Sequence, residues 1–190
     1  MKKYIAIIPL IVYPYAYILW IIGFLLSGLT LEEFIGIDAI MIIFAAIFII
    51  YNVYILFIII YNFIQAIRGK YSAYQLAKMN LLVKGLQIPA YIFHFIIGLI
   101  GFVMSIWGIG FIILAVVVDF LTIALTGLNA LGCAIRIKKE NKASTVVSVF
   151  TGMYSFVFCI DVIIAVVLFV MMYKDDVKNK IKSKEVLLEG

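Results

Sequence analysis

The strongest constraint on the fold of this chain is a series of apolar stretches, each long enough to cross a lipid bilayer. A transmembrane helix needs about 20 mostly apolar residues in succession. Charged and turn-forming residues divide the sequence into five such stretches, at residues 4–28, 39–67, 81–104, 111–135 and 145–173. We therefore predict an all-α protein, a polytopic transmembrane helical bundle of about five spans. The bundle occupies residues 1–173 in this interpretation, and a charged tail follows at 174–190.

The balance of apolar and charged residues points the same way. The chain is 67% hydrophobic and 13% charged, whereas a soluble domain has roughly 45–50% apolar and about 25% charged residues. A soluble protein of this composition would lack the polar groups to cover its surface, but a lipid-facing surface needs none. We therefore expect the lipid bilayer as a partner and no nucleic acid. The frequent use of Ile, Phe, Tyr, Lys and Asn is typical of an AT-rich genome and favours a bacterial source.

Two details support the division into spans. The third and fourth stretches form one long block in which Asp119 is the only charged residue after Lys84, and the block is about twice the length of one span. This block must turn back, and glycines permit a tight hairpin at residues 105–110. The first stretch follows two lysines, as a signal peptide would, but it is much longer than a 7–15-residue signal core. We therefore predict a retained helix there.

Lysine and arginine mark alternate connections of the predicted bundle, and such residues gather in cytoplasmic loops. They lie before the first span, between the second and third, and between the fourth and fifth, at Lys2, Lys3, Arg68, Lys70, Lys78, Lys84, Arg136, Lys138, Lys139 and Lys142. This predicts a multi-pass protein of the cell membrane with a cytoplasmic N-terminus. Five spans leave the lysine-bearing tail outside, which conflicts with the same rule. A miscounted span, with the first (containing Pro9 and Pro14) as the main suspect, would remove the conflict.

An ionisable residue inside a span is by default a functional hypothesis, because lipid penalises it. His94, Asp119 and Asp161 lie inside predicted spans, and Asn52 lies near the middle of the second. We predict that these four residues form an intramembrane polar site. Asp119 and Asp161 lie at similar depths on antiparallel helices, and a buried carboxylate needs a cation, a donor or a shared proton. We therefore expect His94 or Asp119 as the partner of Asp161.

A stripe of polar and small residues continues from Asp119 on the same helical face, at Thr122, Thr126, Asn129 and Cys133. It is either a polar path towards the cytoplasmic surface or a set of hydrogen bonds that hold helices together. Small residues in the fifth span, Ser148, Gly152, Ser155 and Cys159, are typical of close helix packing. We expect both cysteines to be buried as small hydrophobic residues.

Other features keep two interpretations open. The tyrosines of the first two spans either line an aromatic cavity for an amphipathic ligand or pack as ordinary helix contacts; those facing inward are Tyr13, Tyr17, Trp20, Tyr51, Tyr54 and Tyr61. Residues 70–80 are either an interfacial helix or a solvated loop. Lys84 enters the third span as a snorkelling lysine, and Pro89 kinks that span.

Motifs of known membrane enzymes are missing from the sequence. Intramembrane aspartyl proteases have Gly-x-Gly-Asp, but Val116-Val117-Val118 precedes Asp119 here. The sequence contains no metal-ligand spacing, phosphate-binding loop or dinucleotide fingerprint. We predict a protein that is not an enzyme and has no cofactor and no metal.

The segment from Asn80 to Gly98, with its core Lys-x-x-Gln-Ile-Pro-Ala-Tyr, resembles small polytopic membrane proteins of Gram-positive bacteria that have no assigned function. The resemblance implies a membrane location and no particular chemistry. Two hypotheses follow from the residues. The chain is a small transporter or transport-accessory subunit with an intramembrane polar site, which would also require an oligomer or a partner subunit. Alternatively, it is a non-catalytic membrane partner, assembly or immunity subunit.

Overall fold

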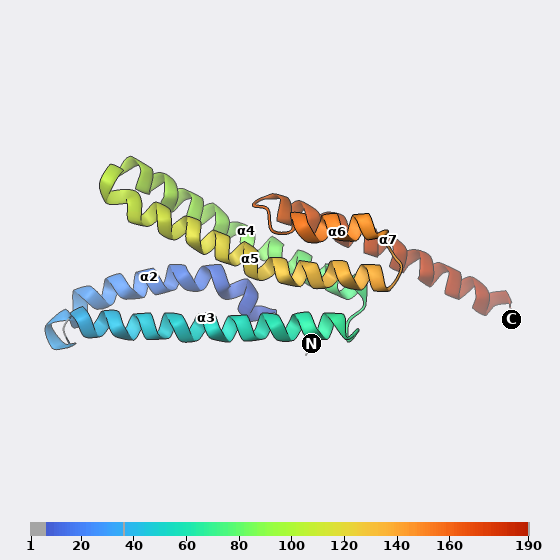
Figure 1. Cartoon of the computed structure of the whole chain (residues 1–190), viewed down its shortest axis with the longest axis horizontal. Helices are drawn as coiled ribbons and strands as arrows, with labels where there is room; N and C mark the ends of the chain where they lie inside the picture. Colours follow the sequence, from blue (N-terminus) through green and yellow to red (C-terminus); the bar gives the residue numbers. More distant parts are fainter. Residues whose placement is uncertain (1–6, 36, 190) are drawn as a thin grey trace. The chain divides into compact units, whose positions relative to one another are not determined.

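A computed structural model describes residues 7–35 and 37–189 of the chain, and these residues form helices and short turns without a strand. The helices are α2 (Ile8–Ile35), α3 (Ile37–Ile67), α4 (Ala73–Val103), the short 3-10 helix η1 (Ser105–Gly108), α5 (Ile109–Lys139), α6 (Thr145–Tyr154) and α7 (Ile160–Glu189) (Figure 1). The predicted all-helical bundle is confirmed. Lys2 and Lys3, on which the predicted orientation partly depends, lie outside the described residues, as does the side chain of Trp20.

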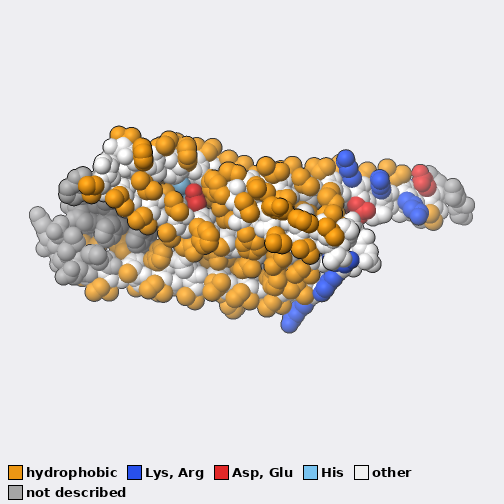
Figure 2. Space-filling model, turned by 45° about the horizontal axis from the view of Figure 1, so that its top comes forward, with side chains coloured by type: hydrophobic (Ala, Val, Ile, Leu, Met, Phe, Trp, Pro, Cys, Tyr) orange, Lys and Arg blue, Asp and Glu red, His pale blue; other side chains and the backbone are white. Residues whose placement is uncertain are grey.

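Three of these helices are long and apolar enough to cross a membrane, at Ile42–Ile67, Ala73–Val103 and Ile109–Lys139. A helix of 31 residues is about 46 Å long, which exceeds the roughly 30 Å of the hydrocarbon core. Large apolar side chains point outward along them, and in the most apolar part of the first only 11% of the residues are buried. Figure 2 shows a face covered mainly by hydrophobic side chains. This surface is compatible with an integral membrane protein.

The chain divides into two compact units. Unit 1 contains Met1–Ile60 and Gln87–Thr122, and unit 2 contains Tyr61–Leu86 and Ile123–Gly190. Helices α3, α4 and α5 each contribute a segment to both units. All lysines and arginines of the described residues belong to unit 2.

In unit 1, α4 and α5 form a hairpin through η1, and this confirms the turn predicted at residues 105–110. The hairpin depends on two glycines. A Cβ atom on Gly108 would overlap the backbone of Gly101, and one on Gly101 would lie 2.8 Å from the carbonyl oxygen of Gly108. The two backbones therefore approach as closely as they do only because neither residue has a side chain.

A second feature of unit 1 explains how α2 tolerates a proline. Pro14 lies inside α2 and has no backbone N–H, so the carbonyl of Leu10 loses its helical partner. The Nε2 atom of Gln87 donates to this carbonyl oxygen at 2.8 Å, and the side chain of Gln87 is fully buried. A side chain of α4 thus replaces the missing backbone bond of α2, which keeps the helix continuous through Ile35.

In unit 2, α4 begins earlier than the predicted third span. Residues 73–80 are helical, as the first turns of α4, so the solvated-loop interpretation of residues 70–80 is wrong for this part, whereas a position at the membrane surface stays a prediction. Ala73, Leu76 and Ala77 lie in a buried core with Leu168 and Met172 of α7. Gln75 and Lys78 are polar and favour the end of a span, but Gln75 is partly buried and Lys78 is exposed within a helix whose other residues here are mostly buried.

The fifth predicted span is two helices instead of one. Figure 1 shows that α6 and α7 run antiparallel, and they contact each other. Within the turn, the backbone N–H groups of Phe156, Val157, Ile160 and Asp161 donate to carbonyls of nearby residues, at 2.8–3.2 Å. Cys159 adopts a left-handed conformation (φ 63°) and is exposed, so the prediction that it is buried is wrong, whereas Cys133 is buried as predicted.

Candidate functional site

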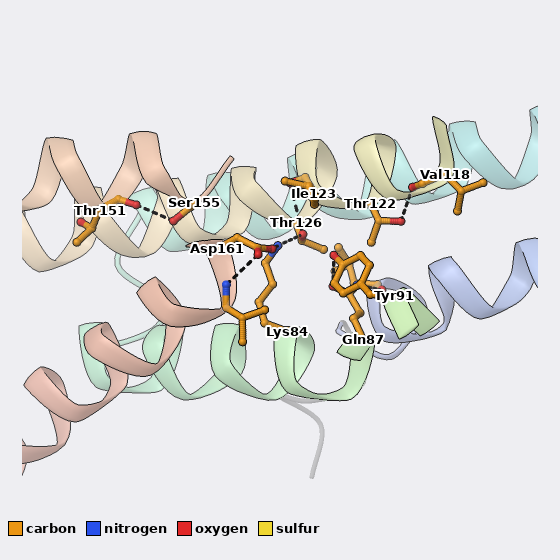
Figure 3. A network of polar contacts seen from close by, with 12 residues as sticks. Lys84, Gln87, Tyr91, Val118, Thr122, Ile123, Thr126, Thr151, Ser155 and Asp161 are labelled. Carbon is orange, nitrogen blue, oxygen red and sulfur yellow. Dashed lines mark hydrogen bonds and ion pairs between the residues drawn. The ribbon is translucent and has the colours of Figure 1, made fainter. Parts of the chain in front are cut away.

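A buried ion pair joins α4 to the α6–α7 hairpin in unit 2. The Nζ atom of Lys84 lies 2.5 Å from Oδ2 of Asp161 and donates to Oγ1 of Thr126, also at 2.5 Å (Figure 3). The side chains of Lys84 and Asp161 are 0% and 1% exposed. The other carboxylate oxygen of Asp161 accepts from the backbone N–H of Val162 at 2.9 Å. Three helices, α4, α5 and α7, therefore meet at one ammonium group.

The break between α6 and α7 places Asp161 at this point. Asp161 lies in the first turn of α7, where the positive end of the helix dipole favours a carboxylate. On the α6 side, the hydroxyls of Thr151 and Ser155 donate to backbone carbonyls one turn earlier, at 2.8 and 2.6 Å. Such bonds compete with a regular helix and commonly accompany bends.

Two glycines allow the hairpin to sit close to its neighbours in unit 2. A Cβ atom on Gly127 of α5 would lie 2.6 Å from the ring of Phe156 in the turn, and one on Gly152 of α6 would lie 2.9 Å from Leu131. The predicted packing role of Gly152 and Ser155 is consistent with this contact, because both are buried. The tip of the hairpin is thereby held against α5, beside Thr126.

The electrostatics of the pair depend on both partners. Each charge alone would be expensive to remove from water, and their attraction offsets that cost only when hydrogen bonds satisfy the remaining atoms. Asp161 has Lys84 and Val162 as donors, and Lys84 has Thr126 and Asp161 as acceptors. Loss of either charge would leave the other buried and uncompensated.

A second acid–base contact lies in unit 1. The Nδ1 atom of His94 in α4 is 2.6 Å from Oδ1 of Asp119 in α5, and the side chains are 5% and 15% exposed. Asp119 therefore pairs with His94, while Asp161 pairs with Lys84. The expectation that Asp161 meets His94 or Asp119 is wrong, because each aspartate has a basic partner of its own.

The predicted polar stripe of α5 is engaged locally. The hydroxyl of Thr122 donates to the carbonyl of Val118 at 2.7 Å, and Thr126 accepts from Lys84. Cys133 lies 4.0 Å from the carbonyl oxygen of Ala73, and Asn129 is half-buried. The contacts of Thr126 and Cys133 join α5 to α4, as the packing interpretation of the stripe expects. A polar path along it stays a prediction.

Asn52, the fourth predicted site residue, belongs to a tyrosine cluster in unit 1. The hydroxyls of Tyr13 and Tyr17 donate to its Oδ1 atom at 2.8 and 3.0 Å, and its own Nδ2 donates to the carbonyl of Phe48. Tyr51 stacks on Tyr13 at 5.9 Å between ring centroids. Beside this cluster lies a mainly apolar cavity of about 300 Å³, lined by Ala16, Tyr17, Leu19, Ile47, Phe48 and Tyr51. The expectation that Tyr54 and Tyr61 are also internal is wrong, because their side chains are 53% and 44% exposed.

A charged cluster around Glu140 ties the ends of the unit 2 helices together. Its Oε1 atom accepts from the first N–H of α4, on Ala73, at 3.1 Å and from Arg136 at 2.8 Å. Lys142 bridges Glu140 and Asp175 of α7, at 3.1 and 3.2 Å. Burial raises the pKa of Glu140, but the bonds from Lys142, Ala73 and Arg136 outweigh it, so the pKa lies below its ordinary value. Glu140 is thus an ionised link between three helices at neutral pH.

Lys84 is the residue that the sequence interpretation missed, since it was expected to snorkel to the surface. The sequence nevertheless contains a pattern that predicts a buried position for Lys84. Polar residues recur along α4 at intervals of three and four, on one helical face, at Asn80, Lys84, Gln87, Tyr91 and His94. Four of the five are buried and Tyr91 is partly buried. The stripe becomes visible only when residues 73–103 are treated as one helix, because a span that begins at residue 81 places Lys84 at its entrance.

Comparison of the chain with known protein families, with curated proteins and with solved structures found no match. Within the described residues, no cluster of three or more His, Cys, Asp or Glu side chains is arranged to hold a metal ion.

Proposed function

We propose that this chain is an integral membrane protein with a role in proton-linked transport, in which the Lys84–Asp161 pair is the proton-responsive element. The observation that carries the proposal is the break between α6 and α7, which brings Asp161, in the first turn of α7, to Lys84. Many transporters place ion and substrate sites at broken helices of this kind, within the membrane.

The topology that we propose has four crossings, α2 to α5, and a hairpin of α6 and α7 that enters the membrane and returns. The ten residues of α6 are too few to cross a bilayer, and segments of 10–14 apolar residues are typical of re-entrant or buried helices. The turn supports this placement because the backbone N–H groups of Phe156, Val157, Ile160 and Asp161 are bonded within it, as a hydrocarbon environment requires. In this topology the N-terminus, both lysine-bearing loops and the tail all lie in the cytoplasm, and the conflict over the tail disappears.

The proposed mechanism follows from charge compensation. A proton bound by Asp161 removes the negative charge that balances Lys84, and a buried ammonium without a counter-charge is strongly disfavoured. Protonation therefore weakens the contact between the hairpin and α4. Release of the proton restores the pair, so the hairpin alternates between a held and a loosened state as protons arrive and leave.

A second candidate function is a non-catalytic partner or assembly subunit. The burial of the ion pair favours this assembly role. Side chains that are 0% and 1% exposed are as suitable for a permanent contact between helices as for a contact that opens and closes. In this case the pair only maintains the surface that a partner membrane subunit or a second copy recognises.

The topology predicts where the tail is accessible. An epitope tag after Gly190 should bind antibody only in permeabilised cells, whereas a tag inserted within Ser105–Gly108 should bind antibody on intact cells. Each tagged protein serves as the control for the other. A C-terminal tag that is accessible on intact cells would show that residues 145–173 cross the membrane and would overturn the re-entrant hairpin.

The transport role predicts a loss of proton movement. In liposomes with an imposed potassium gradient and valinomycin, proton entry reported by an internal pH dye should occur with the native protein and disappear with the double variant Lys84→Met/Asp161→Asn. The matched control is Lys180→Met/Asp176→Asn, because these residues form an ion pair at 2.7 Å on α7 in which Lys180 is exposed and Asp176 is partly exposed. A native protein that moves no protons, or a double variant that moves them at the native rate, would leave only the assembly role.

A further inference from the structure

A groove lies between α5 and α6, entirely within unit 2, and has a volume of about 320 Å³. Its wall is apolar, with Leu131, Ile135 and Val149 among the lining residues. One end of the groove is different, because Lys138 and Lys139 at the end of α5 face the start of α6 there. The groove thus has an apolar wall along its length and basic side chains at one end.

Ser148 adds a polar group that the protein itself does not satisfy. Its side chain lines the groove, it is 8% exposed, and its Oγ atom is buried with no hydrogen-bond partner. A buried hydroxyl without a partner is unusual, because leaving it unpaired costs free energy. It is a polar group beside the groove whose hydrogen bond the protein leaves unmade.

The start of α6 adds further attraction for an anion. The first turn of a helix presents unpaired N–H groups and a partial positive charge. Ser144 caps α6 by accepting from the N–H of Val147 at 3.3 Å, and Thr145 lines the groove. The nearest acidic side chain in sequence, Glu140, is already bound to Arg136 and Lys142. Lys139 uses one donor on the carbonyl of Ile67, and Lys138 is exposed.

We propose that this groove binds an anionic phospholipid, with the phosphate at Lys138, Lys139 and the start of α6 and an acyl chain along Leu131, Ile135 and Val149. The proposal rests on the membrane placement of α5 and α6 but not on transport. In the proposed topology the basic end lies at the cytoplasmic surface, where anionic headgroups attract lysines. The apolar wall favours a lipid over free phosphate, because free phosphate has nothing to place along it.

The test measures lipid binding by the full-length protein in neutral detergent micelles, with phosphatidylglycerol and phosphatidylcholine of the same chain length. Phosphatidylglycerol should bind and raise the melting temperature, and phosphatidylcholine should have little effect. The variant Lys138→Gln/Lys139→Gln should weaken phosphatidylglycerol binding about 30-fold, since each lysine near an anionic headgroup contributes about fivefold. Val149→Trp should weaken it by filling the groove.

Matched controls separate the groove from general charge and general hydrophobicity. Lys178→Gln/Lys182→Gln removes two exposed lysines of α7, and Val146→Trp enlarges an exposed residue of α6 outside the groove. Both should bind phosphatidylglycerol like the native protein. Equal loss in the control and groove variants, equal binding of both lipids, or stabilisation by inorganic phosphate alone would overturn the proposal. Because no proton movement is measured, failure of the transport role would leave this result unaffected.

Discussion

Replacing Lys84 by methionine is expected to lower the free energy of unfolding by about 3–5 kcal/mol, the usual effect of leaving one partner of a buried ion pair uncompensated. Methionine retains most of the apolar length of lysine, so the loss reports the charge and not a cavity. Asp161→Asn should have an effect of similar size, because it leaves the ammonium of Lys84 without a counter-charge at a position that is 0% exposed.

The double variant Lys84→Met/Asp161→Asn should recover most of the lost stability, since a neutral pair of similar volume is often as stable as the ion pair. Unfolding in mixed micelles, followed by circular dichroism, gives the four free energies of the cycle. The pair Lys180–Asp176 again provides the control, because surface ion pairs contribute about 0–1 kcal/mol. Additive losses in the double variant would show that the two charges do not interact.

The second large effect is expected at the turn between α4 and α5. Gly108→Ala should destabilise unit 1 by more than the 1–3 kcal/mol typical of an overpacked core, because the added methyl group meets the backbone of Gly101 and not a movable side chain. The hairpin must open to accept it. Thermal unfolding followed by circular dichroism measures the loss.

Gly110→Ala is the matched control, two residues further along. A Cβ atom there meets nothing within 4 Å, and Gly110 is the second residue of α5. Alanine is favoured over glycine in a helix by up to about 1 kcal/mol, so this variant should be neutral or more stable. Equal destabilisation by both substitutions would contradict the close approach of Gly101 and Gly108.

The sequence predicts the helical class and the turn at residues 105–110 because apolar length and glycine are local signals. It does not predict the break after Tyr154, because residues 155–160 are as apolar as a helix interior. The turn depends on contacts from elsewhere, such as Phe156 against Gly127 and Asp161 against Lys84. A pattern of hydrophobic residues along the sequence contains no information about such contacts between distant residues.

The candidate site shows the same division. His94, Asp119 and Asp161 are recognisable because lipid penalises charge within a span. The partners of these residues cannot be recognised from the sequence, because each pair depends on which faces of two helices contact each other. A span that begins at residue 81 places Lys84 at its entrance, whereas α4 begins at Ala73 and places Lys84 about 16 Å along the helix. A predicted helix start that is eight residues too late therefore hides Lys84 as the counter-charge of Asp161.

The order in which the ribosome makes these residues gives the Lys84–Asp161 contact a consequence for biogenesis. Lys84 and Thr126 are synthesised before Asp161, so α4 and α5 must wait in an immature protein with an ammonium that has no counter-charge. The α6–α7 hairpin supplies that charge last, and its own aspartate finds a partner only within the bundle. Docking of the hairpin therefore completes the ion pair, and a chain that stops before Asp161 keeps the ammonium of Lys84 without its counter-charge.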